Sequence, residues 1–175
     1  MISRILKYLR RYYKIKTMNP SDYARSLGVK VGNNCSIAIN YFGTEPYLIE
    51  IGDKVQITND VRFFNHGGSW IFRHKHPEFD YFGKITIGNN VYIGNCAMIM
   101  PGITIGSNVL IGAGSIITKS IPDNAIVAGN PGKIVGEVNE LFSRVEAYNL
   151  NCKSMNAVEK QIYLLNLSDE KFITK

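Results

Sequence analysis

The chain has 175 residues, of which 45% are hydrophobic and 19% are charged, so a folded domain is expected and global disorder is excluded. Six of its 20 basic residues lie in residues 1–16, which contain no acid; subtracting them leaves 14 basic against 14 acidic residues. The net charge of +6 therefore belongs to the N-terminal segment. This argues against a broad nucleic-acid-binding surface, and we expect no nucleic-acid partner.

Residues 1–28 are predicted to form a basic amphipathic helix and a linker. Apolar side chains recur there at helical spacing, with the basic residues mostly on the opposite face. The apolar residues are Ile2, Ile5, Leu6, Leu9, Tyr12 and Tyr13. Such a helix either caps the open end of the following domain or lies on an anionic membrane surface, and the two roles are compatible.

We expect a cytoplasmic protein, attached at most peripherally to the inner face of the membrane. No apolar run reaches the roughly 18 residues of a membrane span, and no signal-peptide pattern opens the chain. The cysteines, Cys35, Cys96 and Cys152, are odd in number and widely spaced, which fits reduced thiols better than a disulfide framework.

The stretch ITIGNNVYIGNCAMIMPGITIGSNVLIGAGSIITKSIP, from Ile85 to Pro122, places an isoleucine at every sixth position. These are Ile87, Ile93, Ile99, Ile105, Ile111 and Ile117. A period of six fits neither an α-helix nor an alternating strand. Short strands joined by glycine and asparagine turns can build a triangular coil, in which each hexad forms one side and the isoleucines stack inside.

The same step begins earlier, at Ile51, Ile57 and Phe63, and more weakly at Val31 and Ile37. We therefore predict an all-β domain over residues 29–136, a left-handed parallel β-helix. Residues 69–86 depart from the template and are predicted to form a loop thrown out from the coil; loops of this length are usually functional. Residues 137–175 are predicted to be a helical tail that packs on the coil or on a partner subunit and carries no site chemistry.

Several segments resemble the hexapeptide-repeat acyltransferases, and within them the maltose/galactoside and polysaccharide O-acetyltransferase branch. The resemblance covers about residues 29–136; it is carried by the hexads, by FNHGG before the loop, by VYIGNCAMIMPGITIG and by IGAGSIITKSIPDNAIVAGNPGKIV. It implies an acetyl-CoA-dependent O-acetyltransferase that modifies a hydroxyl of a sugar or polysaccharide precursor. It also implies a homotrimer with active sites between subunits.

His66 is the candidate general base. Acyl transfer to a hydroxyl needs a group that takes the hydroxyl proton, and histidine has a suitable pKa. His66 stands where the hexads give way to the loop, the place at which the resemblance implies the catalytic histidine. His74 and His76 are read as solvated or substrate-lining loop residues, and Glu78 or Asp80 is considered as a partner that orients His66.

A zinc site is the sharper alternative for the histidines, because some hexapeptide-repeat proteins resemble carbonic anhydrases. Such a site wants ligands that converge from separate elements, and no histidine follows His76. We therefore expect no metal.

The resemblance implies a donor site lined by residues at the turns of the coil. They are Asn95, Ala113, Thr118, Lys119, Pro131 and Lys133, the last two near the adenine and phosphate end of acetyl-CoA. Asn95 and Ala113 are 18 residues apart, so three hexads per coil would stack them about 4.8 Å apart. The backbone N–H of Asn95 is a candidate oxyanion donor. Gly136 replaces a second basic residue of many relatives, so phosphate binding is expected to be weaker here.

The acceptor site is the least legible from sequence. Its candidates are Asn59, Asn65, Trp70, Arg73 and Tyr92, the last at a position where relatives often have tryptophan. Aromatic and polar side chains together suit a sugar, but equally suit packing against another subunit. An N-acetyltransferase acting on an amino sugar or antibiotic, a zinc-dependent hydratase and a non-catalytic assembly module remain alternatives.

Overall fold

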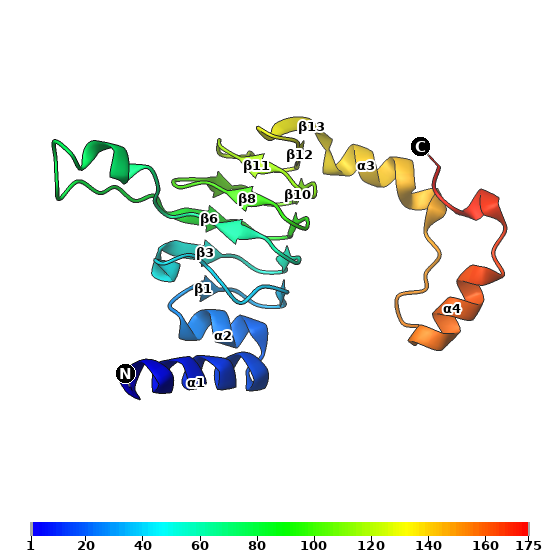
Figure 1. Ribbon diagram of the computed structural model, residues 1–175. Helices are drawn as coiled ribbons and strands as arrows, with labels where there is room; N and C mark the ends of the chain where they lie inside the picture. Colours follow the sequence, from blue (N-terminus) through cyan, green and yellow to red (C-terminus); the bar gives the residue numbers. More distant parts are fainter. Residues whose placement is uncertain (1, 175) are drawn as a thin grey trace. The chain divides into compact units, whose positions relative to one another are not determined.

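The computed structural model describes residues 2–174 and divides the chain after Val138 into two compact units. The first unit is a coil of short strands with two helices at its N-terminal end (Figure 1). Its elements are α1 (Ile2–Thr17), α2 (Pro20–Ser26), β1 (Lys30–Val31), β2 (Ser36–Ile37), a 3₁₀ helix (Pro46–Leu48), β3 (Ile49–Ile51), β4 (Gln56–Ile57), β5 (Arg62–Phe63), a second 3₁₀ helix (Ser69–Phe72), β6 (Ile85–Ile87), β7 (Val91–Ile93), β8 (Met98–Ile99), β9 (Thr104–Ile105), β10 (Val109–Ile111), β11 (Ile116–Ile117), β12 (Ala125–Ala128) and β13 (Lys133–Glu137).

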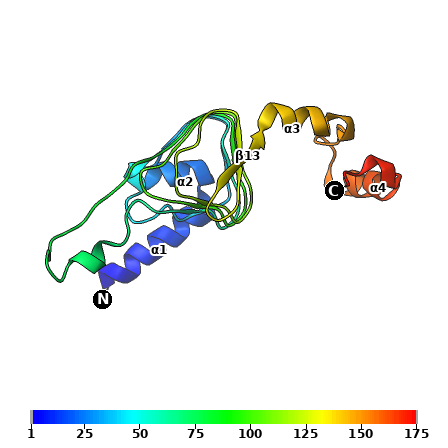
Figure 2. The same ribbon diagram turned by 90° about the horizontal axis from the view of Figure 1, so that it is seen from above.

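Three sheets form the faces of the coil. Their strand orders are β1-β3-β6-β9, β2-β4-β7-β10-β12-β13 and β5-β8-β11, and neighbouring strands are parallel except β12 and β13. Seen from above, successive turns of the coil overlie one another (Figure 2). The predicted parallel β-helix is therefore confirmed in its strand arrangement.

The register explains the period of six. In the central coils, strand partners lie 18 residues apart: Ile87 with Ile105, Ile93 with Ile111, and Ile99 with Ile117. All six side chains are at most 2% exposed and form the interior ladder. Three hexads thus make one coil, and each coil buries its isoleucines against the coils before and after it.

Asparagines hold one corner of the coil. Asn90, Asn108 and Asn124 all adopt left-handed backbone conformations, with φ of 54°, 56° and 62°. Asparagine tolerates this region better than most residues. Their side chains also stack: Asn90 donates to Asn108 over 2.9 Å, and Asn108 donates to Asn124 over 2.7 Å. The asparagines at these turns therefore fix both the turn and its alignment with the next coil.

The regular step breaks at both ends. Ile37 pairs with Ile57, 20 residues further on, and Ile111 pairs with Val127, only 16 further on. The first coil thus holds two extra residues and the last holds two fewer. The extra length lies between Ile37 and Ile51, the span that carries the first 3₁₀ helix.

The loop leaves the coil after His66 and returns at Phe82, and the backbones of these two residues form a bridge. Gly83 N donates to Asn65 O over 2.7 Å directly after the bridge. A Cβ added to Gly83 would run into the backbone of Gly102, so this close approach requires glycine. The loop projects away from the coil in both views (Figures 1 and 2).

The predicted loop boundaries need correction. The sequence ended the loop at residue 86, but Ile85 and Thr86 belong to β6, because Ile85 is fully buried and pairs with Ile49. Ile85 lies two residues before Ile87 on the same strand, so both side chains face the interior of the coil, although Ile85 is not a member of the six-residue series that contains Ile87. The predicted loop start at residue 69 also falls late, since Gly67 and Gly68 follow the bridge.

The N-terminal segment contains two helices where the sequence predicted one helix and a linker. α2 begins after Asn19, whose side chain accepts from Ser21 N over 2.9 Å, and has proline in its first turn. It buries Tyr23 and Ala24 at the end of the coil. The capping element is therefore α2. This helix has only seven residues, which is too short for an apolar period to be visible in the sequence.

The boundary between the units falls after the first residue of α3 (Val138–Val145). The second unit contains the rest of α3, a 3₁₀ helix (Glu146–Tyr148), α4 (Ala157–Leu165) and a last 3₁₀ helix (Asp169–Lys171). A capping box begins α4: the Asn156 side chain accepts from Glu159 N, and the Glu159 side chain accepts from Asn156 N. Within residues 2–174, no helix has both the length and the apolar character needed to cross a membrane.

Candidate functional site

His66 lies where the chain leaves the coil for the loop, at the end of the face that contains β5. Its ring packs against the ring of Phe82, with the centroids 5.5 Å apart. The side chain is 40% exposed, so a bound molecule can reach it. A partly exposed imidazole on a rigid bridge can exchange a proton with such a molecule.

Thr44 and Glu45 hold one nitrogen of His66. Thr44 Oγ1 lies 2.9 Å from His66 Nε2 and donates its proton to Glu45 Oε2 over 2.8 Å. Glu45 Oε2 lies 3.5 Å from the same nitrogen. A hydroxyl has one proton to give, so Thr44 must accept from His66 Nε2. Nε2 therefore carries a proton, and the free lone pair of a neutral His66 is on Nδ1.

The hydrogen-bond and ion-pair partners of His66 are Thr44 and Glu45, not Glu78 or Asp80, the partners considered from the sequence, although the charge of His66 contributes to lowering the pKa of Asp80. Asp80 accepts from Ser69 Oγ over 2.6 Å and from Tyr81 N over 3.0 Å, and pairs with Arg73 over 3.3 Å. These contacts tie the two arms of the loop together. The Ser69 hydroxyl, helped by Tyr81 N–H and by the positive charge of Arg73, holds the pKa of Asp80 below its usual value.

Thr44 and Glu45 are not evident from the sequence as partners of His66, because they precede it by about 20 residues and lie outside any hexad. A signal was present. Ile37 and Ile51 are 14 residues apart, where two regular hexads would span 12, so two residues must bulge from the coil. The bulge places Thr44 and Glu45 beside the point where the loop leaves.

Asn59, Asn95 and Ala113 stack at the opposite corner of the same face; we call them the Asn95 column. Cys96 N donates to Asn59 O over 3.0 Å, and Gly114 N donates to Asn95 O over 2.8 Å. The side chains of Asn95 and Ala113 are exposed. The stacking of Asn95 and Ala113 that the 18-residue step predicts is present. Asn59, a candidate acceptor residue, extends the column toward the N-terminal end of the coil.

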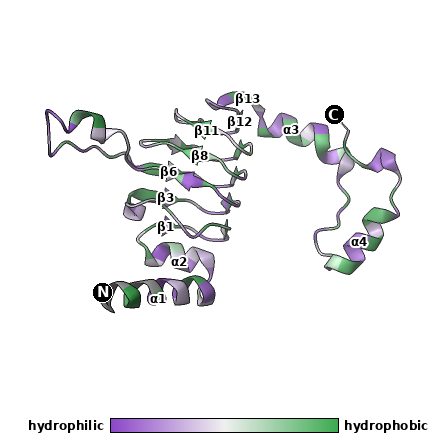
Figure 3. Ribbon diagram, viewed as in Figure 1, coloured by the Kyte–Doolittle hydropathy of each residue, from purple (hydrophilic) through white to green (hydrophobic). Residues whose placement is uncertain are grey.

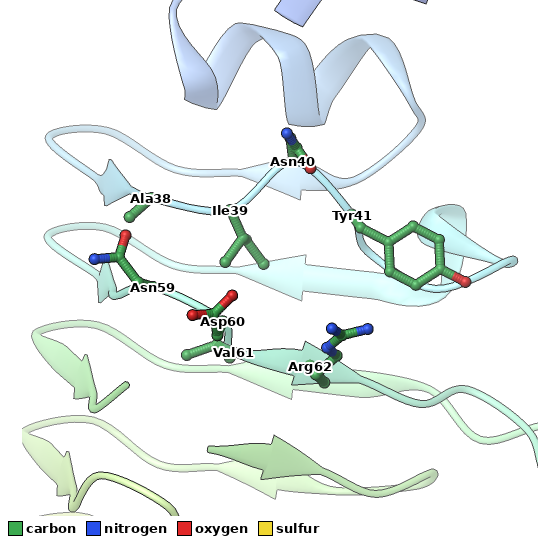
Figure 4. A pocket seen from close by; sticks show the side chains of 8 residues that line it. All are labelled: Ala38, Ile39, Asn40, Tyr41, Asn59, Asp60, Val61 and Arg62. Atoms are coloured by element: carbon green, nitrogen blue, oxygen red, sulfur yellow. The ribbon is translucent and has the colours of Figure 1, made fainter. Parts of the chain in front are cut away.

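A pocket of ≈ 340 Å³ lies at the foot of the Asn95 column. It is lined by Ala38, Ile39, Asn40, Tyr41, Asn59, Asp60, Val61 and Arg62. Figure 4 shows the two segments that form it, Ala38–Tyr41 from the first coil and Asn59–Arg62 from the next. An amide, a carboxylate, a guanidinium and an aromatic ring meet there, which suits a polar molecule with an apolar face.

A second pocket, of ≈ 360 Å³, gathers four of the residues predicted for the donor site, Thr118, Lys119, Pro131 and Lys133. Its apolar walls come from Ile117, Ile121, Val127 and Ile134, and Ser120 and Gly132 complete the lining. Residues 118 and 119 follow β11 as His66 follows β5, so both lie at one edge of the β5-β8-β11 sheet. Two strand spacings, about 10 Å, separate them along that edge.

A single chain does not bring His66 and the Asn95 column together. Asn59 precedes β5 and His66 follows it, so the two corners lie at opposite ends of the β5-β8-β11 sheet. Extended chain rises about 3.3 Å per residue, which puts them on the order of 20 Å apart. The predicted donor residues are thus divided between the two corners.

The acceptor candidates are also dispersed. Asn65 is only 1% exposed; its Nδ2 donates to Gly83 O over 3.4 Å, and its Oδ1 is buried without a partner. Asn65 therefore lies inward, at the root of the loop. Trp70 is 83% exposed on the 3₁₀ helix of the loop, and its carbonyl oxygen accepts from Arg73 N. Tyr92 lies on the outer side of a different sheet, in a shallow hollow with Gln56 and Leu110.

Within residues 2–174, no three side chains of histidine, cysteine, aspartate or glutamate cluster closely enough to hold a metal ion. His74 Nδ1 contacts Ile71 O at 3.0 Å within the loop, apart from the partners of His66.

Comparison with known proteins agrees with the repeat. The family model "Bacterial transferase hexapeptide (six repeats)" matches residues 84–119. Protein CapG of Staphylococcus aureus is 50% identical over 160 residues, covering 89% of this chain and 93% of CapG. Galactoside O-acetyltransferase of Escherichia coli (strain K12) is 37% identical over 121 residues, covering 69% of this chain and 60% of the relative. The structure of a galactoside acetyltransferase in complex with coenzyme A superposes with a TM-score of 0.61 at 29% identity, covering 79% of this chain and 82% of the other.

Proposed function

The chain belongs to the hexapeptide-repeat acyltransferase family, and from this we propose that it transfers an acetyl group from acetyl-CoA to a hydroxyl of a sugar or polysaccharide precursor. Membership of the family implies the left-handed sense of the coil. The observation that carries the mechanism is a partly exposed histidine, His66, held on one nitrogen by Thr44 and Glu45. Because acetyl-CoA is made inside cells, the reaction belongs in the cytoplasm.

Acetyl-CoA supplies the activated acyl group as a thioester. His66 takes the proton of the acceptor hydroxyl as its oxygen bonds to the acyl carbon, and the carbon–sulfur bond breaks. The proton then passes to the leaving thiolate, which restores neutral His66. Transfer is direct, with no covalent enzyme intermediate, and the backbone N–H of Asn95 is the donor proposed for the developing oxyanion.

The proton is taken at Nδ1 of His66, because Nε2 already donates to Thr44. Glu45, through Thr44, is a positioning residue in this scheme: it fixes the tautomer and stabilises the imidazolium that forms. Glu45 touches neither the acceptor nor the thioester in this proposal. Its contribution therefore falls on the rate of the chemical step rather than on substrate binding.

Glu45→Gln is expected to lower kcat by about 10- to 100-fold with little change in either KM, because a misplaced base costs rate. Steady-state kinetics measures the change, and ¹⁵N chemical shifts of His66 report whether the Nε2–H tautomer is lost. Glu50→Gln is the matched control, since Glu50 is a partly exposed carboxylate paired with Lys30 across the first coils. An unchanged kcat for Glu45→Gln, or a KM effect alone, would contradict the positioning role.

The active site is proposed to form between the subunits of a homotrimer. His66 and the Asn95 column lie on the order of 20 Å apart at opposite ends of one sheet, too far for one acyl group to contact both. If subunits pack with the His66 corner of one against the Asn95 column of the next, His66 and Asn95 come together in one active site. A monomeric protein with full activity would exclude this arrangement.

Lys119 and Lys133 are proposed to contact the phosphates of acetyl-CoA from the pocket that they line with Thr118 and Pro131. Lys133→Gln is expected to raise KM for acetyl-CoA about tenfold, the loss of one charge-assisted hydrogen bond. The preference for CoA over 3′-dephospho-CoA, measured by calorimetry, should fall if Lys133 meets the 3′-phosphate. Lys84→Gln serves as the control outside the pocket.

An acetyl-CoA-dependent assay tests the proposal as a whole. Release of free thiol is followed with a panel of sugars, amino sugars and aminoglycosides, beside calorimetry with acetyl-CoA alone. Transfer to a hydroxyl supports the proposal, and transfer only to an amine assigns the chain to N-acetylation. Failure to bind acetyl-CoA would overturn the proposal in favour of an assembly module.

A further inference from the structure

The outward face of α1 is apolar and uncovered. Its side chains are between 54% and 68% exposed in the part of α1 where they are described. They are Ile5, Leu6, Leu9, Tyr12 and Tyr13. At about 100° per residue these five fall within roughly 120° of arc, so they form one continuous stripe. Figure 3 shows hydrophobic and hydrophilic residues alternating along α1.

This stripe is not the surface by which α1 docks on the coil. Ile15 and Met18 line a pocket with Tyr23 of α2 and Ile37 of β2. On the helix they lie about 120° and 180° from the centre of the exposed stripe. α2 already closes the end of the coil with Tyr23 and Ala24. The exposed stripe is therefore not needed to cap the end of the coil.

Basic residues accompany the stripe. Arg10 and Lys14 continue the helix surface beyond Leu6 and Tyr13, and the Lys16 ammonium lies 5.9 Å from the centroid of the Tyr12 ring. No acidic residue occurs in residues 1–16. Among the described side chains of α1, none forms an ion pair, and Lys14 Nζ donates only to Ser26 Oγ over 3.3 Å.

We propose that the outward face of α1 lies on an anionic membrane surface, with the apolar stripe in the lipid interface and the basic residues against the head groups. Charge complementarity selects this occupant. A second copy of α1 would bring the same uncompensated positive charge, and the rest of the chain carries 14 basic against 14 acidic residues and so offers no net attraction. An acidic lipid surface satisfies both the charge and the apolar stripe.

The membrane contact goes beyond the proposed function and does not depend on it. If both hold, acetyl transfer takes place beside the bilayer, and an acceptor carried on a lipid would be favoured over the same acceptor free in solution. The binding test below needs no turnover, so failure of the membrane proposal and failure of the acetyltransferase proposal are distinguishable.

The experiment is co-sedimentation of the full chain with two kinds of vesicle, phosphatidylcholine alone and an equal mixture of phosphatidylcholine and phosphatidylglycerol. Binding to the mixed vesicles, weakened by salt, and little binding to the neutral ones is expected. The double variant Leu6→Glu, Leu9→Glu should lower binding at least about tenfold, since it removes apolar area and adds repulsion. Arg10→Gln should lower it about fivefold.

Leu165→Glu is the control, because Leu165 is a leucine even more exposed than Leu6 and Leu9 but lies on α4. Oligomeric mass by light scattering is measured for every variant. If the double variant binds mixed vesicles as well as the parent does, or the parent ignores them, the proposal is overturned. A fall in oligomeric mass caused by the double variant would overturn it too, because the stripe would then be a contact between subunits.

Discussion

Replacing His66 with alanine is expected to lower kcat by about 10²- to 10⁴-fold and to leave acetyl-CoA affinity unchanged. The loss corresponds to the removal of a positioned general base. Thr44 and Glu45 contact one nitrogen of the imidazole, and the proposed mechanism uses the other nitrogen as the base, so alanine would remove that base without changing the pocket of Lys119 and Lys133. Thiol release gives the rate, and calorimetry gives the affinity.

The fold should survive this substitution, because the bridge between residues 66 and 82 is made by backbone atoms. His74→Ala is the matched control: His74 lies in the same loop, and its ring forms a hydrogen bond with Ile71 O rather than with Thr44 or Glu45. It should retain nearly full activity. Partial rescue of the His66→Ala protein by added imidazole would support a base at this position, whereas full activity without rescue would refute the mechanism.

The second large effect concerns stability. Ile93→Ala is expected to lower the free energy of unfolding by about 3 to 5 kcal/mol, at the upper end for such truncations. Ile93 is fully buried between Ile57 of the coil before and Ile111 of the coil after. The register fixes both neighbours, so the cavity has little freedom to collapse.

Chemical denaturation measures the change at a fixed protein concentration, since the stability of the proposed homotrimer would depend on concentration. Ile162→Ala removes the same atoms from an exposed side chain of α4 and should cost no more than about 0.5 kcal/mol. Equal effects of the two substitutions would mean that the ladder of isoleucines does not carry the stability of the coil.

The parts that could be predicted from sequence are those in which one residue repeats one environment. Each isoleucine of the ladder packs against isoleucines of the neighbouring coils, so the period of six predicts the coil directly. The sequence does not predict α2, because a helix of seven residues is too short to show an apolar period. Ile85 falls outside the series of every sixth residue, which resumes at Ile87, so the series alone places Ile85 in the loop.

Of the candidate site, the sequence clearly indicates only His66. His66 stood out because the chain has three histidines and one of them marks the end of a hexad series. Thr44 and Glu45 reach it through a bulge in the preceding coil, a contact that no local pattern announces. The separation of His66 from Asn95 depends on which corner of the coil each occupies. That becomes apparent only when the three faces are assembled.

The last strand has a consequence for how the molecule ends. β13 runs antiparallel to β12, Gly132 N donates to Ile116 O above β11, and Ile121 bridges Ile105 above β9. The bridge of Ile121 is parallel, so the reversal is confined to the face of β12, where β13 runs antiparallel and ends the parallel template. A solenoid whose rim stayed open would invite another molecule to stack on it and grow into a fibre. The reversal at β13 limits the coil to a finite length, so molecules are free to meet side by side.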